Sequence, residues 1–172
     1  KNFEKYFKKY NNYDSVPSIH EVYVMQILQK KLKPKSIIIN GQPGDGINGS
    51  YIYKEFIVNK KNLKIVFNKI IEKHYSLWSH LKVKKNIQLI KRYLNYEYKK
   101  YSQKKINHPY QLMLFTSYQN RICKFLMKNF QVYENFNFKW YSPYMDQRFI
   151  NFWFSIPIKF HLNRNLSKKI LK

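Results

Sequence analysis

The chain has few of the residues that several specialised protein classes need. It holds a single cysteine, Cys123, so no disulfide can form within it and a disulfide-rich secreted scaffold is excluded. No apolar run approaches the roughly 18 residues of a membrane-spanning helix. No apolar segment follows Lys1 and Asn2, as it would in a secretory signal. These absences predict a cytoplasmic protein without a membrane span.

Acidic residues are also scarce, since 9 Asp and Glu stand against 33 Lys and Arg and the formal net charge is +24. Such a surplus attracts phosphate backbones, so a basic nucleic-acid-binding or assembly protein is one hypothesis. The chain lacks alanine and has one threonine, Thr116, while Lys, Asn, Ile, Tyr and Phe abound, which indicates A/T-rich coding. Because lysine far outnumbers arginine and is spread along the chain, we favour a solvated lysine surface over specific nucleic-acid recognition.

The apolar residues that are present predict a folded, mostly helical α/β chain. The 172 residues suffice for one domain, and 44% hydrophobic and 19% aromatic residues can bury a core. Helical periodicity predicts helices at 19–32, 63–78, 83–101, 110–130 and 146–155. The β-branched run 36–40 predicts one parallel-type strand buried on both faces, and 140–143 is interpreted as a turn. We expect a single domain 1–172, with a strand-loop block at 36–51 and a helical remainder at 60–172.

The loop after this strand holds all four glycines of the chain. A strand that leads through a glycine-rich loop into a helix can present backbone N–H groups and a carboxylate to phosphates. Asp45 is the only acid of the loop, and Mg²⁺ sites use one or two carboxylates together with phosphate oxygens. The loop has neither the Walker A lysine nor dinucleotide spacing. On these residues alone, a phosphate-binding loop and an ordinary surface loop stay equally open.

Two segments resemble one protein family. Segment 37–51, IIINGQPGDGINGSY, looks like the strand and loop of the asparagine synthase C-terminal (synthetase) domain, whose loop reads S-G-E-G-x-D-E-x-F-G-G-Y. Segment 141–157, YSPYMDQRFINFWFSIP, is similar to the family's R-x-P-F-L-D-x-R-L-V-E-F-x-L-S-L-P, and 168–172 to its K-x-I-L-R. The order of the segments also fits. The N-G-x-x-G-D run at 40–45, combined with the later residues 119–121 (QNR), 132–134 (VYE) and 140–143 (WYSP), looks closer to asparagine-synthase-like proteins of bacterial surface-polysaccharide (lipopolysaccharide) gene clusters.

The resemblance implies the C-terminal part of an adenine-nucleotide alpha-hydrolase-like (PP-loop ATP pyrophosphatase) domain with few strands. The implied activity is that of an ATP-dependent amide ligase: ATP and Mg²⁺ activate a carboxylate as an acyl-adenylate, which ammonia or another amine attacks. It further implies that Lys168 or Lys169 is the catalytic tail lysine, and that Asp45 is the Mg²⁺ ligand. The cofactor-binding positions that it implies are Asn40, Gly41, Gly44 and Asp45.

The departures from the family bear on activity. The family's loop glutamate is replaced by Gln42, a catalytic position at which a carboxamide cannot act as a base, so proton transfer occurs elsewhere or the nucleophile differs. No S-G-G-x-D-S motif occurs in 1–35, and no glutaminase domain is recognisable. The resemblance therefore implies a piece of a longer synthetase, with a separate glutaminase subunit as one source of ammonia. Alone, the chain is not expected to convert ATP to AMP.

Overall fold

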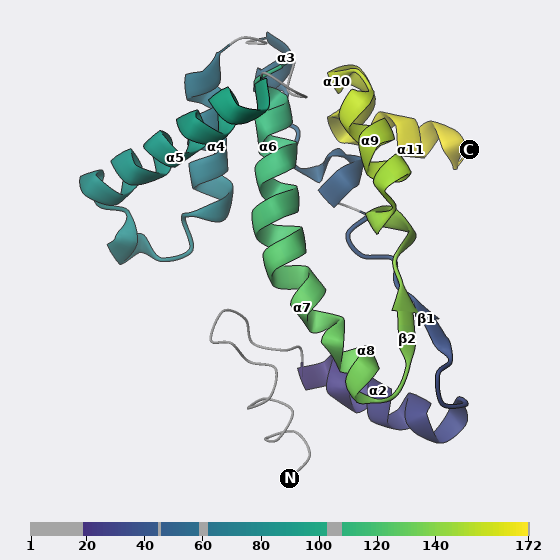
Figure 1. The fold of residues 1–172 in the computed structure, drawn as a ribbon. Coiled ribbons are helices and arrows are strands. Elements are labelled where there is room, and N and C mark those ends of the chain that lie inside the picture. The colour runs from purple at the N-terminus through teal and green to yellow at the C-terminus, as the bar shows by residue number, and fades with distance from the viewer. Residues whose placement is uncertain (1–18, 45, 59–61, 103–107, 172) are drawn as a thin grey trace. The chain divides into compact units, whose positions relative to one another are not determined.

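The computed structural model of the protein describes residues 19–44, 46–58, 62–102 and 108–171 (Figure 1). This part of the chain is mostly helical and contains two short strands, so the predicted mostly helical α/β class is confirmed. The chain divides into two compact units: unit 1 comprises Lys1–Gly44 and Gln119–Ile150, and unit 2 comprises Asp45–Tyr118 and Asn151–Lys172. No helix in the described ranges is both long and apolar enough to cross a membrane.

Unit 1 is built on a pair of parallel strands. Its elements are α2 (Ile19–Lys31), β1 (Ile37–Ile39), most of η3 (Ser117–Leu126), α7 (Met127–Asn129), α8 (Gln131–Asn135), β2 (Lys139–Tyr141), η4 (Pro143–Met145) and the start of α9 (Gln147–Ser155). Its core joins Val22 and Met25 of α2 to buried aromatic and aliphatic residues around α8, with Ile38 and Trp140 packed against them. The indole of Trp140 lies 4.7 Å from the Phe130 ring and donates a 3.0 Å hydrogen bond to Glu134.

The strand pair confirms one expectation and corrects two. β1 and β2 are parallel, with Ile38 opposite Trp140, as the β-branched run predicted. However, Ile37 and Ile39 are 62% and 73% exposed, so the expected burial on both faces is wrong. The described chain supplies a core to one face of this pair, and of the three β1 side chains only Ile38 packs against it, beside Trp140 of β2. The predicted turn at 140–143 is in part a strand, because Trp140 and Tyr141 belong to β2.

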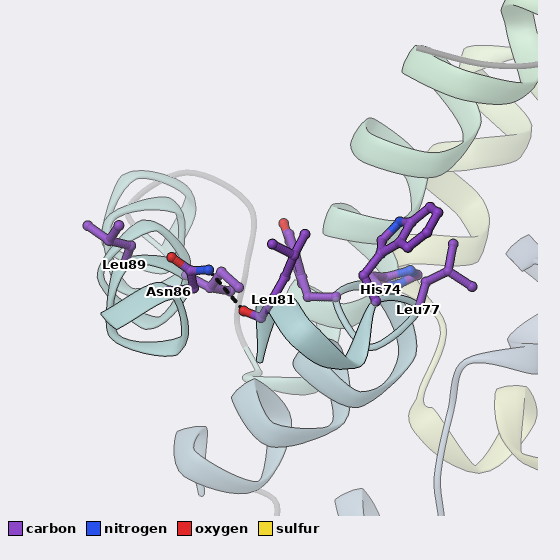
Figure 2. Close-up of a pocket in the computed structure, with 8 residues that line it drawn as sticks. His74, Leu77, Leu81, Asn86 and Leu89 are labelled. Atoms are coloured by element: carbon purple, nitrogen blue, oxygen red, sulfur yellow. Dashed lines mark hydrogen bonds between the residues drawn. The ribbon is translucent and has the colours of Figure 1, made fainter. Parts of the chain in front are cut away.

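Unit 2 contains the remaining helices. They are η1 (Gly46–Ser50), α3 (Glu55–Val58), α4 (Leu63–His74), η2 (Ser79–Leu81), α5 (Lys84–Ser102), α6 (Tyr110–Thr116), the end of α9, α10 (Ile158–His161), η5 (Leu162–Arg164) and α11 (Asn165–Ile170). An apolar pocket of about 410 Å³ opens between the end of α4 and the start of α5 (Figure 2). Helix α4 ends earlier than predicted, because the Ser76 hydroxyl donates to the Ile71 carbonyl at 2.9 Å and the chain turns away.

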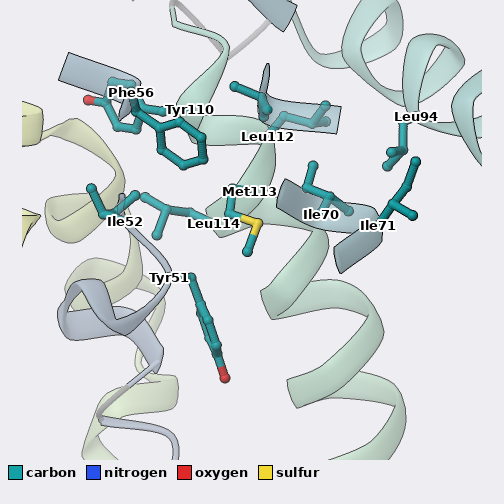
Figure 3. Packing of buried hydrophobic residues seen from close by; sticks show 11 residues of the cluster. Tyr51, Ile52, Phe56, Ile70, Ile71, Leu94, Tyr110, Leu112, Met113 and Leu114 are labelled. Atoms are coloured by element: carbon teal, nitrogen blue, oxygen red, sulfur yellow. The ribbon is translucent and has the colours of Figure 1, made fainter. Parts of the chain in front are cut away.

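The core of unit 2 lies around α4 and α6 (Figure 3). Its most deeply buried side chains come from the four helices α3, α4, α5 and α6, namely Phe56, Val66, Ile70, Leu94, Leu112 and Met113. A second packing point joins η1 to the end of α10 and to η5. There Gly49 has a φ of +100°, and a Cβ would lie 2.3 Å from the carbonyl oxygen of His161, the last residue of α10. Only glycine fits that contact.

His161 is the most unusual buried residue of unit 2. Its side chain is fully buried, and neither ring nitrogen has a well-aligned hydrogen-bond partner within the described chain. The rings of Trp153 and Tyr110 lie 5.6 and 6.5 Å from it. Burial lowers the pKa of His161 to about 4, although backbone groups at Trp153 and Ile156 oppose the shift. The imidazole is therefore neutral at physiological pH.

Helical structure continues through 110–129, from α6 through η3 (Ser117–Leu126) to α7, as predicted. The chain passes from unit 2 to unit 1 within this stretch, between Tyr118 and Gln119. The predicted helices at 19–32, 83–101 and 146–155 are also present, each within one residue of the expected bounds. Each unit is therefore made of two stretches of sequence that are interleaved with those of the other.

Candidate ligand-binding loop

The glycine-rich segment predicted to carry chemistry begins where the parallel strands end. The backbone N–H of Asn40 donates to the Tyr141 carbonyl at 2.9 Å, which extends the strand pairing by one residue on each side. Residues 40–44 then turn away from the carboxyl end of β1. Ligands of parallel sheets commonly bind at this edge, where the strands end and the loops begin. The predicted loop therefore lies at the edge of the strand pair where ligands commonly bind.

The side chain of Asn40 holds the first turn of the loop. Its carbonyl oxygen accepts a 2.7 Å hydrogen bond from the backbone N–H of Gln42, and its amide nitrogen donates to the Tyr133 hydroxyl at 2.5 Å. Burial raises the pKa of the Tyr133 phenol, and the carboxylate of Glu21 raises it further, while the bond from Asn40 opposes them. The phenol therefore stays neutral at physiological pH and accepts from Asn40, which acts as a positioning residue.

The second segment of the resemblance packs directly against the first. The buried hydroxyl of Ser142, which follows β2, donates a hydrogen bond to the backbone carbonyl of Gln42. The Gln42–Pro43 peptide bond is cis, and the backbone N–H of Gly44 donates to the Gly41 carbonyl at 3.0 Å. Two segments that lie about 100 residues apart in sequence are joined here, and the side chain of Gln42 remains exposed.

The two described glycines of the turn differ in what surrounds them. A Cβ on Gly44 would lie 2.9 Å from two carbons of the Tyr144 ring, so its missing side chain is needed for packing. A Cβ on Gly41 would have nothing within 4 Å, and the φ of Gly41 is not in the left-handed region. Neither packing nor backbone conformation requires glycine at position 41, which is exposed.

Helix α9 begins within the second segment of the resemblance. The carboxylate of Asp146 accepts from the backbone N–H of Arg148 at 2.8 Å, and from the guanidinium of Arg148 at 3.1 Å. These hydrogen bonds from Arg148 lower the pKa of Asp146 to about 2. Because Asp146 directly precedes α9, this pair orders the first turn of that helix. The Asp146–Arg148 pair therefore has a structural role.

The structure brings together four of the predicted site residues, Asn40, Gly41, Gln42 and Gly44, in one turn of unit 1. The predicted Mg²⁺ ligand Asp45 lies outside the described residues. Lys168 and Lys169 are exposed on α11, which belongs to unit 2. No group of three or more His, Cys, Asp or Glu side chains within the described ranges could hold a metal ion. The metal and lysine roles therefore stay predictions.

Sequence reasoning missed the three residues that support the turn: Tyr133, Ser142 and Tyr144. Ser142 and Tyr144 fall inside the second segment of the resemblance, so a search for polar or aromatic residues beside its proline would have found them. Tyr133 belongs to the quoted residues 132–134, but nothing in the sequence indicates that this one of 16 tyrosines supports the loop.

Comparisons of the chain with protein-family models, with curated proteins and with solved structures find no match. The family resemblance rests on the quoted residues, and the geometry of the loop stands beside it as a separate observation.

Proposed function

We propose that the turn at 40–44 is part of the nucleotide-binding loop of an ATP-dependent amide ligase of the asparagine synthase type. The supporting observation is that the two segments that resemble this family meet in unit 1. Strand β1 of the first segment pairs in parallel with β2, whose last residue, Tyr141, begins the second segment. Ser142 donates to the carbonyl of Gln42, and the Tyr144 ring packs on Gly44. If the similarity of either segment to the family were accidental, there would be no reason to expect the two segments to be in contact.

The open position at Gly41 also supports the proposal. Glycine loses more conformational entropy on folding than other residues do. Replacing a glycine that the fold does not need therefore stabilises the folded protein. A ligand that approaches the backbone closely supplies a different reason to keep it, as in other phosphate-binding loops. Gly41 and Gln42 are exposed at the carboxyl edge of the strand pair, where such a ligand would bind.

In the proposed reaction a substrate carboxylate attacks the α-phosphorus of ATP, pyrophosphate leaves, and an amine then displaces AMP to form the amide. Asp45, which directly follows Gly44, would hold Mg²⁺, and this ion would neutralise charge on the phosphates. Lys168 or Lys169 would stabilise the adenylate. Gln42 has no basic group, so its carboxamide would orient the amine through hydrogen bonds. A sugar-linked carboxylate of surface-polysaccharide synthesis is the proposed acceptor, and a PP-loop domain is the proposed fold family.

The proposal predicts Mg²⁺-dependent binding of ATP that requires Asp45. Calorimetric titration should be done at about 150 mM salt, where nonspecific attraction by the basic surface is screened beyond about 8 Å. Wild-type protein should bind ATP more tightly with Mg²⁺ than with EDTA. Asp45→Asn should weaken MgATP binding about tenfold or more, because an amide is a poor ligand for Mg²⁺.

Glu72→Gln is the matched control, because it makes the same change of charge at an exposed site on α4. It should bind MgATP as the wild type does. Equal affinities in wild type, Asp45→Asn and Glu72→Gln, with no effect of Mg²⁺, would reduce the interaction to attraction between a basic protein and any polyanion. Steeply salt-dependent DNA binding that persists at this salt concentration would favour the nucleic-acid hypothesis instead.

A further inference from the structure

A group of exposed apolar side chains lies at the connection between α4 and α5 in unit 2. We call it the apolar turn, and it consists of Leu77, Trp78, Leu81, Val83 and Leu89. Leu77 is 84% exposed and Trp78 is 60% exposed, although each could bury a large apolar surface. Four of the five residues line the pocket of about 410 Å³ (Figure 2). A contiguous patch of this kind marks an interaction site more often than scattered apolar residues do.

The apolar turn is held in a defined conformation by hydrogen bonds. The side-chain amide of Asn86 donates to the Leu81 carbonyl at 2.9 Å (Figure 2). The backbone N–H groups of Leu81 and Lys82 donate at 3.1 Å to the carbonyls of Trp78 and Ser79. The exposed side chains therefore project from an ordered backbone, and a partner would not have to order it on binding.

A polar pair beside the pocket does not make it a catalytic site. His74 Nε2 lies 2.8 Å from the Ser117 hydroxyl oxygen, which is a spacing that a serine nucleophile and its base would show. However, the Ser117 hydroxyl donates its proton to the Met113 carbonyl at 2.6 Å. It therefore accepts from His74, so the imidazole is not placed to remove the proton of Ser117.

The apolar turn lies in a stretch of sequence, 73–96, whose charged residues are all basic. Between Glu72 and Glu97 the sequence contains no acidic residue, and Glu97 is buried. Four exposed lysines lie before or between the apolar residues, and they are Lys73, Lys82, Lys84 and Lys85. A surface with apolar side chains at its centre and lysines beside them is complementary to a partner that has an apolar interior beneath a negatively charged surface.

We propose that the apolar turn docks unit 2 on an anionic lipid bilayer, with Leu77, Trp78 and Leu81 in the interfacial region and the lysines at the headgroups. Tryptophan is favoured at that depth because its ring is apolar and its N–H is polar. Each lysine near an anionic surface adds attraction, and the apolar side chains add the part that salt does not screen. A nucleic acid would satisfy the lysines and leave Leu77 and Leu81 in water. This docking function goes beyond the proposed ligase activity.

Flotation of the full chain with lipid vesicles tests the proposal. Vesicles of phosphatidylcholine should be compared with vesicles that contain about 30% phosphatidylserine, at about 150 mM salt. The chain should float with the anionic vesicles and not with the neutral ones. Leu77→Ser/Trp78→Ser should weaken this partitioning about tenfold or more without a change in charge, because two exposed side chains lose their apolar contact with lipid.

Val58→Ser/Leu171→Ser is the matched control, because both residues are exposed apolar side chains of unit 2 outside the apolar turn. It should partition as the wild type does. Lys82→Gln/Lys84→Gln should weaken partitioning more than Lys99→Gln/Lys100→Gln, which makes the same change of charge near the other end of α5. Circular dichroism should show the same helix content in all these variants, because the substituted residues are exposed.

Three results would overturn the proposal. One is equal partitioning of wild type and Leu77→Ser/Trp78→Ser, and another is equal loss in the two lysine pairs, since attraction would then depend on total charge alone. The third is the absence of vesicle binding together with binding of a single-stranded oligonucleotide that Leu77→Ser/Trp78→Ser weakens, which would assign the apolar turn to nucleic acid. None of these results bears on MgATP binding, so the two proposals can fail separately.

Discussion

At the scale of single residues, Gly41 and Gly44 occupy one turn but lack a side chain for different reasons. Gly44→Ala should lower the free energy of unfolding by about 1–3 kcal/mol, because the new Cβ would displace the Tyr144 ring. Gly41→Ala should change stability by less than about 1 kcal/mol, since the site is open. Urea denaturation followed by circular dichroism measures both. Equal losses in the two variants would contradict the packing argument.

The same pair of variants tests the proposed ligand. If a phosphate approaches the backbone at Gly41, Gly41→Ala should weaken MgATP binding by about tenfold while the protein remains folded. Unchanged binding would remove the support that the open glycine gives to the proposed function.

His161 makes stability depend on pH. Its pKa of about 4 in the folded protein lies below the ordinary 6.5 of the unfolded chain, so the unfolded state binds a proton first as the pH falls. Stability from this residue is therefore complete above pH 6.5 and is lost progressively down to about pH 4. The loss between about pH 7 and pH 5 should be about 2 kcal/mol, because one pKa unit corresponds to 1.36 kcal/mol.

Urea denaturation at the two pH values measures this loss in wild type, in His161→Phe and in His80→Gln. The fall in stability should be about 2 kcal/mol smaller in His161→Phe, and unchanged in His80→Gln, whose imidazole is exposed in the wild type. Only the difference between pH values is compared, so a direct effect of the Phe substitution on stability does not affect the result. An identical fall in all three proteins would show that other groups cause it.

At the scale of elements, helix α4 depends on the residue before it. The side-chain oxygen of Asn62 accepts from the backbone N–H groups of Lys64 and Ile65 at 3.1 and 3.3 Å. Asn62→Ala should cost about 1 kcal/mol in the free energy of unfolding, because the first turn loses its cap. Asn62→Asp should retain the cap and interact favourably with the N-terminus of the helix. Chemical denaturation of the two variants checks this order, and a reversed order would refute the assignment of the cap.

Helices could be predicted from this sequence more reliably than strands. The apolar periodicity of 83–101 and 110–130 spans several turns, so the bounds of these helices are close to those observed. β2 has three residues, and the alternation of Lys139, Trp140 and Tyr141 is too short to distinguish a strand from a turn. The strand β1 could be predicted as parallel, but its exposure depends on how many elements cover it, which its own residues do not encode.

At the scale of the whole molecule, the position of the candidate loop could be predicted and its support could not. The glycines and Asn40 are neighbours in sequence, so a local pattern reveals them. The contacts from Tyr133, Ser142 and Tyr144 come from segments about 100 residues later, and only the fold brings them together. The division into two interleaved units has no signal in the sequence either, because the Lys and Asn bias is uniform along the chain.

Because β1 pairs with β2, which comes about 100 residues later in the sequence, the strand pair can form only late in synthesis. Ile38 pairs with Trp140, so its partner leaves the ribosome about 100 residues later, which takes about 5–20 s at about 5–20 residues per second. For that time β2 is not available to the backbone N–H and C=O groups of β1, so this strand, with its exposed Ile37 and Ile39, is open to pairing with other chains. Helices α4 and α5 of unit 2 can form in the meantime, so the nascent protein passes through a stage in which these helices are present before β1 can pair with β2.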